Sequence, residues 1–264
     1  MTNALNISFI GAGNVATHLA RHLFSLGHNI KGIYSRTLEN AQRLAEQVNT
    51  IGVSRLDQLP NADIYFFTVP DSVLPSIITQ FASVRTKGIW VHTAGCHSLS
   101  VFPQGIHCGV LYPLQTFTKD CHLNLHGTPI FFESDNASVY RQLEELAFQL
   151  SGDARPLGSS SRALLHLAAV FGCNFSNHCY TIAENLLKQA GIDEKVLLPL
   201  ISETARKVRI LPAREAQTGP AIRNDLGTIE THRSLLSERP ELLNLYNLMT
   251  SSIQTHLTNN KTSI

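Results

Sequence analysis

The sequence predicts an α/β protein, in which a doubly wound parallel sheet is followed by an all-helical region. Three observations support this prediction. A short apolar run ends in a glycine turn at Gly11, strand and helix patterns alternate through the first 157 residues, and only helical patterns follow. We therefore expect two domains, formed by residues 1–157 and 158–264.

The first strand, turn and helix have the order of a dinucleotide-binding fingerprint. The apolar run Ile7–Ile10 leads into a G-x-G-x-x-A motif that begins with Gly11 and Gly13, and a helical pattern follows. The first glycine makes the sharp turn, and the second lets a pyrophosphate approach the backbone. The N–H groups of Asn14 and Val15 then lie at the positive end of the helix dipole. Because strand and helix surround the glycines, this context favours a nucleotide site over an accidental turn.

The end of the second strand predicts which nucleotide binds. The strand Ile30–Tyr34 is followed by Ser35, Arg36 and Thr37, whereas an NAD site places an acidic residue there to accept the ribose 2′-hydroxyl. A hydroxyl and a guanidinium suit a 2′-phosphate better than a carboxylate would. We therefore predict NADP(H), with these three residues in the cofactor site. In the alternative interpretation, Arg36 is a solvated turn residue beside a Thr37 helix cap.

Two later strands complete the predicted cofactor site. In a parallel sheet, ligands bind beyond the carboxyl ends of the strands. Val69 and Pro70 follow one strand and would present an apolar surface to the nicotinamide ribose, while Thr93 and Gly95 follow the next strand and would line the far side. The alternative is that both are ordinary turns at strand ends.

Beyond the alternating region the patterns change. The strands predicted near residues 108–112 and 128–132 are joined by shorter links and need not follow the parallel order, and Pro156 restricts a last strand to an edge. Four helices are then expected, over residues 160–190, 194–210, 221–237 and 240–257. The first is apolar on more than one side, so we expect it to be buried inside a bundle.

This long helix carries polar groups at regular spacing. His166, Val170, Asn174 and His178 lie four residues apart and share one face. A histidine and an amide on an otherwise apolar helix suggest proton transfer, so His166 and Asn174 are candidate catalytic residues. The alternative is that both are core polar groups that hydrogen bond to neighbouring helices.

The segment from Gln217 to Asp225 is the second candidate. Thr218 can donate a hydrogen bond, Arg223 can clamp a carboxylate, and Asp225 lies seven residues before His232 on the same helical face. We therefore assign Thr218, Arg223 and Asp225 to substrate binding and add His232 to the catalytic candidates. The alternative is a structural loop in which Arg223 pairs with Asp225.

Composition excludes several other classes. With 43% hydrophobic residues, 16% charged residues and a net charge of +1, the chain resembles ordinary globular proteins and has no basic footprint for nucleic acid or acidic membranes. No segment predicts a signal peptide or a membrane span, and the histidines lack the spacing of a metal site. Five scattered cysteines indicate reduced thiols and a cytoplasmic protein: Cys96, Cys108, Cys121, Cys173 and Cys179.

Several motifs together resemble a bacterial group of NADP oxidoreductases with a Rossmann-like domain and a helical domain of uncharacterised function. They are Gly11–Asn14, Tyr34–Thr37, Val69–Asp71, His92–Gly95, Leu114–Phe117 and Thr218–Asp225. That group is similar to pyrroline-5-carboxylate reductases, deazaflavin-dependent NADP oxidoreductases and β-hydroxyacid dehydrogenases. The resemblance implies that Gly11, Gly13, Ser35 and Arg36 hold the cofactor, and that the helical domain closes the site and forms a homodimer.

The chain departs from its characterised relatives in two places. If Asn174 matches the asparagine of the β-hydroxyacid dehydrogenases, their catalytic lysine falls on Val170, and Tyr112 stands where the nearest group often has histidine. His166, His232 or Tyr112 would then supply the proton. We expect an NADPH-dependent reductase that transfers hydride to a small carbonyl or imine substrate that carries a carboxylate. The alternative is a non-catalytic NADP(H)-binding sensor or assembly protein.

Overall fold

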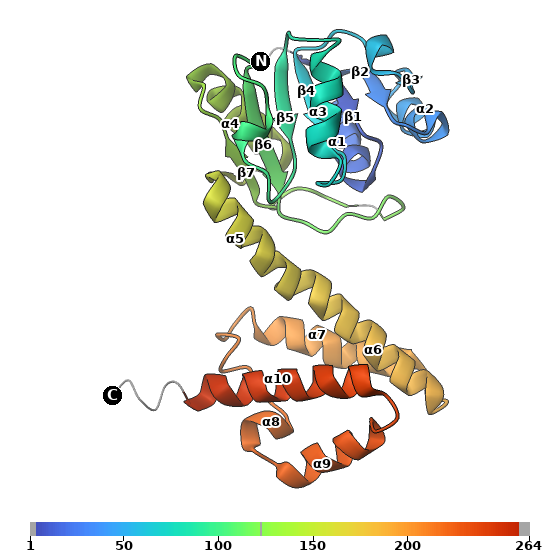
Figure 1. Ribbon diagram of the computed structural model, residues 1–264, viewed down its shortest axis with the longest axis vertical. Helices are drawn as coiled ribbons and strands as arrows, with labels where there is room; N and C mark the ends of the chain where they lie inside the picture. The colour runs from blue at the N-terminus through green and yellow to red at the C-terminus, as the bar shows by residue number, and fades with distance from the viewer. Residues whose placement is uncertain (1–3, 122, 259–264) are drawn as a thin grey trace. The chain divides into compact units, whose positions relative to one another are not determined.

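The computed structural model describes residues 4–121 and 123–258 (Figure 1). The chain divides into two compact units, Met1–Cys179 and Tyr180–Ile264. The first contains the sheet and the start of a long helix, and the second is helical.

An eight-stranded sheet forms the first unit, in the order β3-β2-β1-β4-β5-β6-β7-β8. Strands β1 to β6 run parallel, β7 is antiparallel to β6, and β8 is parallel to β7. The order 3-2-1-4-5-6 is that of a dinucleotide-binding sheet, so the predicted fold class is confirmed. The strands are β1 (Asn6–Ile10), β2 (Asn29–Tyr34), β3 (Gly52–Val53), β4 (Ile64–Phe67), β5 (Ile89–His92), β6 (Cys108–Pro113), β7 (Ile130–Glu133) and β8 (Ala154–Pro156).

Helices cover both faces of this sheet. One core contains apolar residues of α1 (Asn14–Ser25), α2 (Leu38–Gln47) and α4 (Ala137–Ser151). The other contains residues of α3 (Leu74–Ala82) and of the short 3-10 turn η1 (Leu56–Gln58), with η2 (Leu99–Val101) packed against it. Successive residues of β4 alternate between the two cores, as a strand buried on both faces requires.

The long helix begins with α5 (Ser159–Ala169), continues through a π-helical segment, η3 (Val170–Phe175), and ends as α6 (Ser176–Gln189). The sequence predicted its extent but not the π segment. Our expectation that this helix is buried is wrong for the single chain, because Leu164 is 68% and Phe171 63% exposed. Among the described residues of this helix, only Arg162 is buried.

The second unit contains η4 (Glu194–Leu197), α7 (Leu198–Lys207), α8 (Pro220–Arg223), α9 (Leu226–Leu235) and α10 (Pro240–Thr258). The single helix expected over residues 221–237 is wrong: Asn224 adopts a left-handed conformation with φ 51° and separates α8 from α9. Asp225 then caps α9, because its side chain accepts a hydrogen bond from the Thr228 N–H. Within residues 4–121 and 123–258, no helix has the length and apolarity to cross a bilayer.

Candidate functional site

The glycine turn after β1 has the geometry that a pyrophosphate requires. Gly11 has φ 121°, and a Cβ there would lie 2.6 Å from the carbonyl oxygen of Thr68, so only glycine fits. Gly13 has an ordinary extended conformation, and a Cβ there would meet only that same oxygen, at 3.9 Å. The space above Gly13 is therefore open at the start of α1, where helix N–H groups lack intrahelical partners.

The segment after β6 lies against this turn. The Asn14 side chain donates to the carbonyl oxygen of Phe117 at 2.8 Å, and Nε2 of His18 donates to that of Thr118 at 2.9 Å. The Asn14 side chain is therefore engaged, which leaves its backbone N–H for a cofactor. The sequence identifies Leu114–Phe117 only as a family motif, because no local pattern predicts the contact between Asn14 and Phe117.

Arg36 is available at the end of β2. Its side chain is exposed and makes no hydrogen bond or ion pair within the described residues. Thr37 stands at the N-cap of α2 without a side-chain capping bond, and its N–H reaches the Ser35 hydroxyl at 3.4 Å. An exposed Arg36 beside the N-cap residue Thr37 fits both interpretations, because a solvated guanidinium is also free to meet a phosphate.

The ends of β4 and β5 lie next to each other in the sheet. Val69 is half-buried and Pro70 exposed after β4, while Thr93 is half-buried after β5. Gly95 is buried, and a Cβ there would lie 2.5 Å from Cγ of His166. The close packing of the His166 ring therefore requires glycine at position 95, a reason that the sequence did not reveal.

His166 is hydrogen bonded at the end of β6. Its Nδ1 lies 3.0 Å from the Tyr112 hydroxyl, and the two rings meet edge to face. Burial raises the pKa of Tyr112, with smaller upward contributions from Cys96 and Asp71, so this side chain is a neutral phenol at pH 7. Two of the three proposed proton donors therefore form one pair.

A buried arginine fixes the first turn of α5. Arg162 is fully buried one turn before His166, and it donates to the Glu133 carboxylate and to the His97 carbonyl oxygen. Glu133 also accepts from the Ser159 N–H at 3.0 Å. These contacts attach the start of the helix to the end of β7 and thereby position His166.

We expect the substitution Arg162→Met to lower the free energy of unfolding by about 3 kcal/mol, because it leaves the Glu133 carboxylate without its ion-pair partner. Arg155→Met is the matched control, since its ion pair with Asp153 is exposed and should contribute less than about 1 kcal/mol. Urea unfolding measures both. Equal losses in the two variants would contradict the anchoring role of Arg162.

His92 is a second histidine near these strand ends, but it is not an available acid. Burial lowers the pKa of His92 to about 3, with smaller contributions from Arg162 and His97. Its Nδ1 accepts from the Ala94 N–H at 3.2 Å, which places the proton of the neutral ring on Nε2. His92 is therefore a neutral core side chain.

The second unit carries the other candidates. Thr218 and Arg223 are exposed, and Arg223 makes no ion pair or hydrogen bond within the described part of the chain. Both carboxylate oxygens of Asp225 bond to Thr228, at 3.1 Å to its N–H and 2.8 Å to its hydroxyl, and these bonds lower the pKa of Asp225. The Arg223–Asp225 pair of the alternative interpretation does not form, so Arg223 remains available.

Two further catalytic candidates lie elsewhere. His232 on α9 bonds through Nδ1 to the Tyr246 hydroxyl on α10 at 2.9 Å, a link between two helices. Asn174 is exposed in the π segment, eight residues and therefore roughly 12 Å along the helix from His166. Of the predicted polar stripe, only His166 lies at the strand ends.

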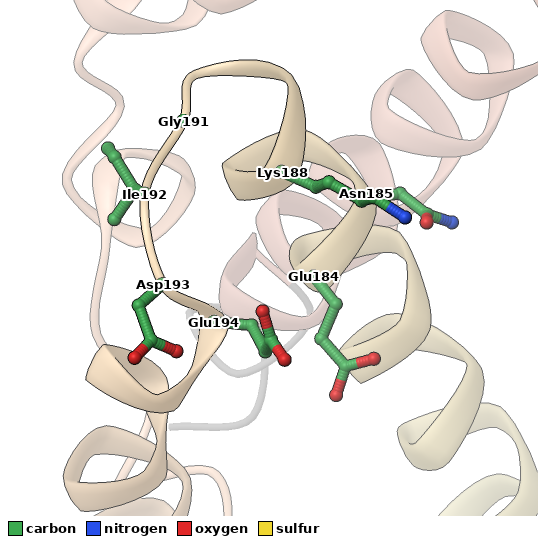
Figure 2. Close-up of a pocket in the computed structure, with 7 residues that line it drawn as sticks. All are labelled: Glu184, Asn185, Lys188, Gly191, Ile192, Asp193 and Glu194. Atoms are coloured by element: carbon green, nitrogen blue, oxygen red, sulfur yellow. The ribbon is translucent and has the colours of Figure 1, made fainter.

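A concavity of about 540 Å³ lies in the second unit, where α6 meets the turn before η4 (Figure 2). Its lining includes Glu184, Lys188, Asp193 and Glu194. Asp193 caps η4 through the Lys195 N–H. Among the described residues, no three His, Cys, Asp or Glu side chains are arranged so that they could hold a metal ion.

Comparison with known families gives two matches. Residues 6–92 match the coenzyme F420-dependent NADP oxidoreductase family, and residues 128–253 match a domain of unknown function, DUF2520. No curated protein matches the chain.

Solved structures resemble nearly the whole chain. A Bacteroides fragilis protein provisionally assigned as an NADP oxidoreductase is 38% identical, with a TM-score of 0.91 over 96% of this chain and 98% of that one. An Aspergillus terreus reductive aminase bound to NADPH and ethyl-5-oxohexanoate is 16% identical, with a TM-score of 0.67 over 96% and 95%. A Myxococcus stipitatus imine reductase bound to NADP⁺ is 14% identical, with a TM-score of 0.68 over 96% and 94%. At these low identities the last two show a shared fold alone.

Proposed function

This chain belongs to the NADP oxidoreductase family in which a nucleotide-binding sheet domain precedes a DUF2520 domain, and we propose that it is an NADPH-dependent reductase. Its substrate would be a small molecule that carries a carboxylate and a C=O or C=N bond. The observation that carries this proposal is that the open glycine turn at Gly11 and the unpaired Arg36 follow the neighbouring strands β1 and β2, at the same end of the sheet.

The residues at this edge suit NADP(H). The glycine turn and the N–H groups that open α1 would hold the pyrophosphate, and the residues after β2 would hold the 2′-phosphate. The residues after β4 and β5 would line the nicotinamide. When bound, NADPH supplies the hydride. The proposed contacts are Gly11, Gly13, Asn14, Val15, Ser35, Arg36, Thr37, Val69, Pro70, Thr93 and Gly95.

His166 is the proton donor that we favour, because it lies against Gly95 at the strand ends where the nicotinamide would lie. His232 and Asn174 remain candidates for a smaller catalytic contribution than that of His166. Thr218, Arg223 and Asp225 are proposed for the substrate, with Arg223 pairing with its carboxylate.

We also propose a homodimer formed through the helical domain. Large apolar side chains are exposed along the long helix and through the second unit, and exposed apolar surface of this kind marks an interface. The family resemblance implies a homodimer, so we propose that a second copy of this chain covers this apolar surface. These side chains are Leu164, Leu167, Phe171, Phe175, Leu186, Val196, Leu198, Leu200, Ile210, Leu226, Leu235 and Leu248. A cytoplasmic location is proposed from the five cysteines, all of which are free thiols.

Two cyclic imines that differ in one group test this function. We expect the protein to reduce pyrroline-2-carboxylate and 2-methylpyrroline with NADPH. Arg223→Ala should raise KM for the carboxylate-bearing imine by about 10- to 100-fold, because a charge-assisted hydrogen bond is lost, and should leave KM for the methyl analogue unchanged.

Arg209→Ala is the control, since Arg209 is another exposed arginine of the same unit. If Arg223→Ala impairs both imines equally, the carboxylate role is wrong. If the unaltered protein binds NADPH but reduces neither these imines nor a panel of keto acids, the reductase proposal is wrong.

A second function, an NADP(H)-binding sensor without turnover, is favoured by one observation. If Asn174 matches the asparagine of the β-hydroxyacid dehydrogenases, Val170 stands at the position of their catalytic lysine, and its side chain cannot transfer a proton. Bound NADPH without reduction would support this second function.

A further inference from the structure

The protein contains two tyrosine–histidine pairs of the same kind. In each pair the tyrosine hydroxyl meets Nδ1 of the histidine, at 3.0 Å for Tyr112 and His166 and at 2.9 Å for Tyr246 and His232. The hydrogen bonds are alike, but the surroundings differ. The first pair joins a strand end to α5 in the first unit, and the second joins α9 to α10 in the second unit.

The first pair lies in the row of strand ends. From β1, which carries the glycine turn, the sheet continues through β4 and β5 to β6, at whose end Tyr112 lies. Three strand spacings of about 4.8 Å place Tyr112 roughly 14 Å from the glycine turn. His166 lies in contact with Gly95, which follows β5, the strand next to β6. The pair therefore lies on the side of the glycine turn toward which the nicotinamide half of a dinucleotide extends.

Three features fix the position of the His166 ring. The absence of a side chain at Gly95 leaves space for the ring, and the hydrogen bonds of Arg162 anchor the preceding turn of α5. The Tyr112 hydroxyl is hydrogen bonded to Nδ1. Nε2 has no hydrogen-bond partner in the described part of the chain. The other charged or titratable groups that act on the pair are Asp71 after β4, Cys96 after β5 and Arg162.

We propose that Tyr112 is the positioning residue for proton transfer: its hydroxyl holds Nδ1 of His166, so that the Nε2–H bond of the imidazolium faces the substrate. The inference rests on the proposed reductase function and deepens it. A phenol suits this task because its oxygen accepts from Nδ1–H, both in the charged ring and in the neutral ring that is left when the Nε2 proton is transferred.

The proton step balances as follows. A hydride from the nicotinamide cofactor adds to the C=N or C=O carbon, and the π electron pair moves to the nitrogen or oxygen. That pair forms a bond to the proton of His166 as the Nε2–H bond breaks. The ring is left neutral, with its remaining proton on Nδ1 and directed at the Tyr112 oxygen, and it regains a proton from water.

The second pair provides the matched control. Tyr112→Phe should lower kcat for 2-methylpyrroline by about tenfold, the loss expected for one hydrogen bond to a charged partner, while KM and NADPH affinity stay within about twofold. Tyr246→Phe should leave kcat as in the unaltered protein. An equal loss of kcat in Tyr246→Phe, or none in Tyr112→Phe, overturns the proposal.

A measurement without turnover separates this inference from the reductase proposal. In ¹⁵N-labelled protein saturated with NADP⁺, the His166 NMR signal is identified by its absence in His166→Asn. The chemical shift of its Nδ1 should change in Tyr112→Phe, because the hydrogen bond to that nitrogen is lost, and should stay unchanged in Tyr246→Phe. An unchanged Nδ1 shift in Tyr112→Phe overturns the hydrogen-bonded pair. A changed Nδ1 shift in a protein that reduces no substrate supports the pair but contradicts the reductase function, and with it the positioning role of Tyr112.

Discussion

Arg36→Asp should lower NADPH affinity by about 100-fold, the largest change that we expect for any residue of the cofactor site. The substitution removes the charge-assisted hydrogen bonds proposed for the 2′-phosphate and puts a carboxylate beside it. An acidic residue at this strand end is also what an NAD site uses for the ribose hydroxyl, so NADH affinity should be kept or improved. Fluorescence or calorimetric titration with each nucleotide measures both effects.

The control is Arg43→Asp, an exposed arginine on α2 that pairs only with Glu39. It should bind both nucleotides as the unaltered protein does. Equal weakening of NADPH and NADH in Arg36→Asp would instead indicate damage to the fold, and an unchanged preference for NADPH would show that the 2′-phosphate lies elsewhere.

His166→Asn should lower kcat by about 10²- to 10⁴-fold, the range that a general acid contributes, and leave NADPH affinity nearly unchanged. Asparagine keeps a polar group beside Gly95 but supplies no proton. Steady-state kinetics with 2-methylpyrroline measures the loss, and NADPH titration reports whether the site is intact.

His232→Asn is the matched variant in the second unit, because His232 has the same tyrosine partnership. We expect only a small change in its kcat, together with some loss of stability where α9 meets α10. The reverse result, with His232→Asn inactive and His166→Asn active, would transfer the acid role to His232.

The sequence predicted the sheet well because its signals are local. The strand, glycine turn and helix around Gly11 follow one another directly in the sequence, and the apolar strands alternate with amphipathic helices that cover both sheet faces. The reversal of β7 could be anticipated only as a departure from parallel order, because the described part of the segment between β6 and β7 contains no helix and its sequence does not fix the direction of the next strand.

The contacts around His166 could not be predicted in the same way. Tyr112 is 54 residues away in the sequence. Gly95 has the local pattern of a turn glycine, but glycine is required there because a larger residue would clash with the His166 ring. The break at Asn224 was also missed, because a left-handed asparagine has no periodic signal. Apolar periodicity predicted a buried long helix, but periodicity alone does not say whether the chain itself supplies a surface that covers the apolar faces.

Transfer of deuterium from NADPH labelled at C4 of the nicotinamide tests the central claim most directly. After incubation with pyrroline-2-carboxylate, 2-methylpyrroline and a panel of keto acids, products are examined by mass spectrometry, with an imine reductase as the positive control. A reductase will place one deuterium on the former C=N or C=O carbon of at least one substrate, and His166→Asn will greatly slow this transfer. Protein that binds NADPH tightly yet labels no substrate, while the control enzyme does, would contradict the claim and favour the sensor.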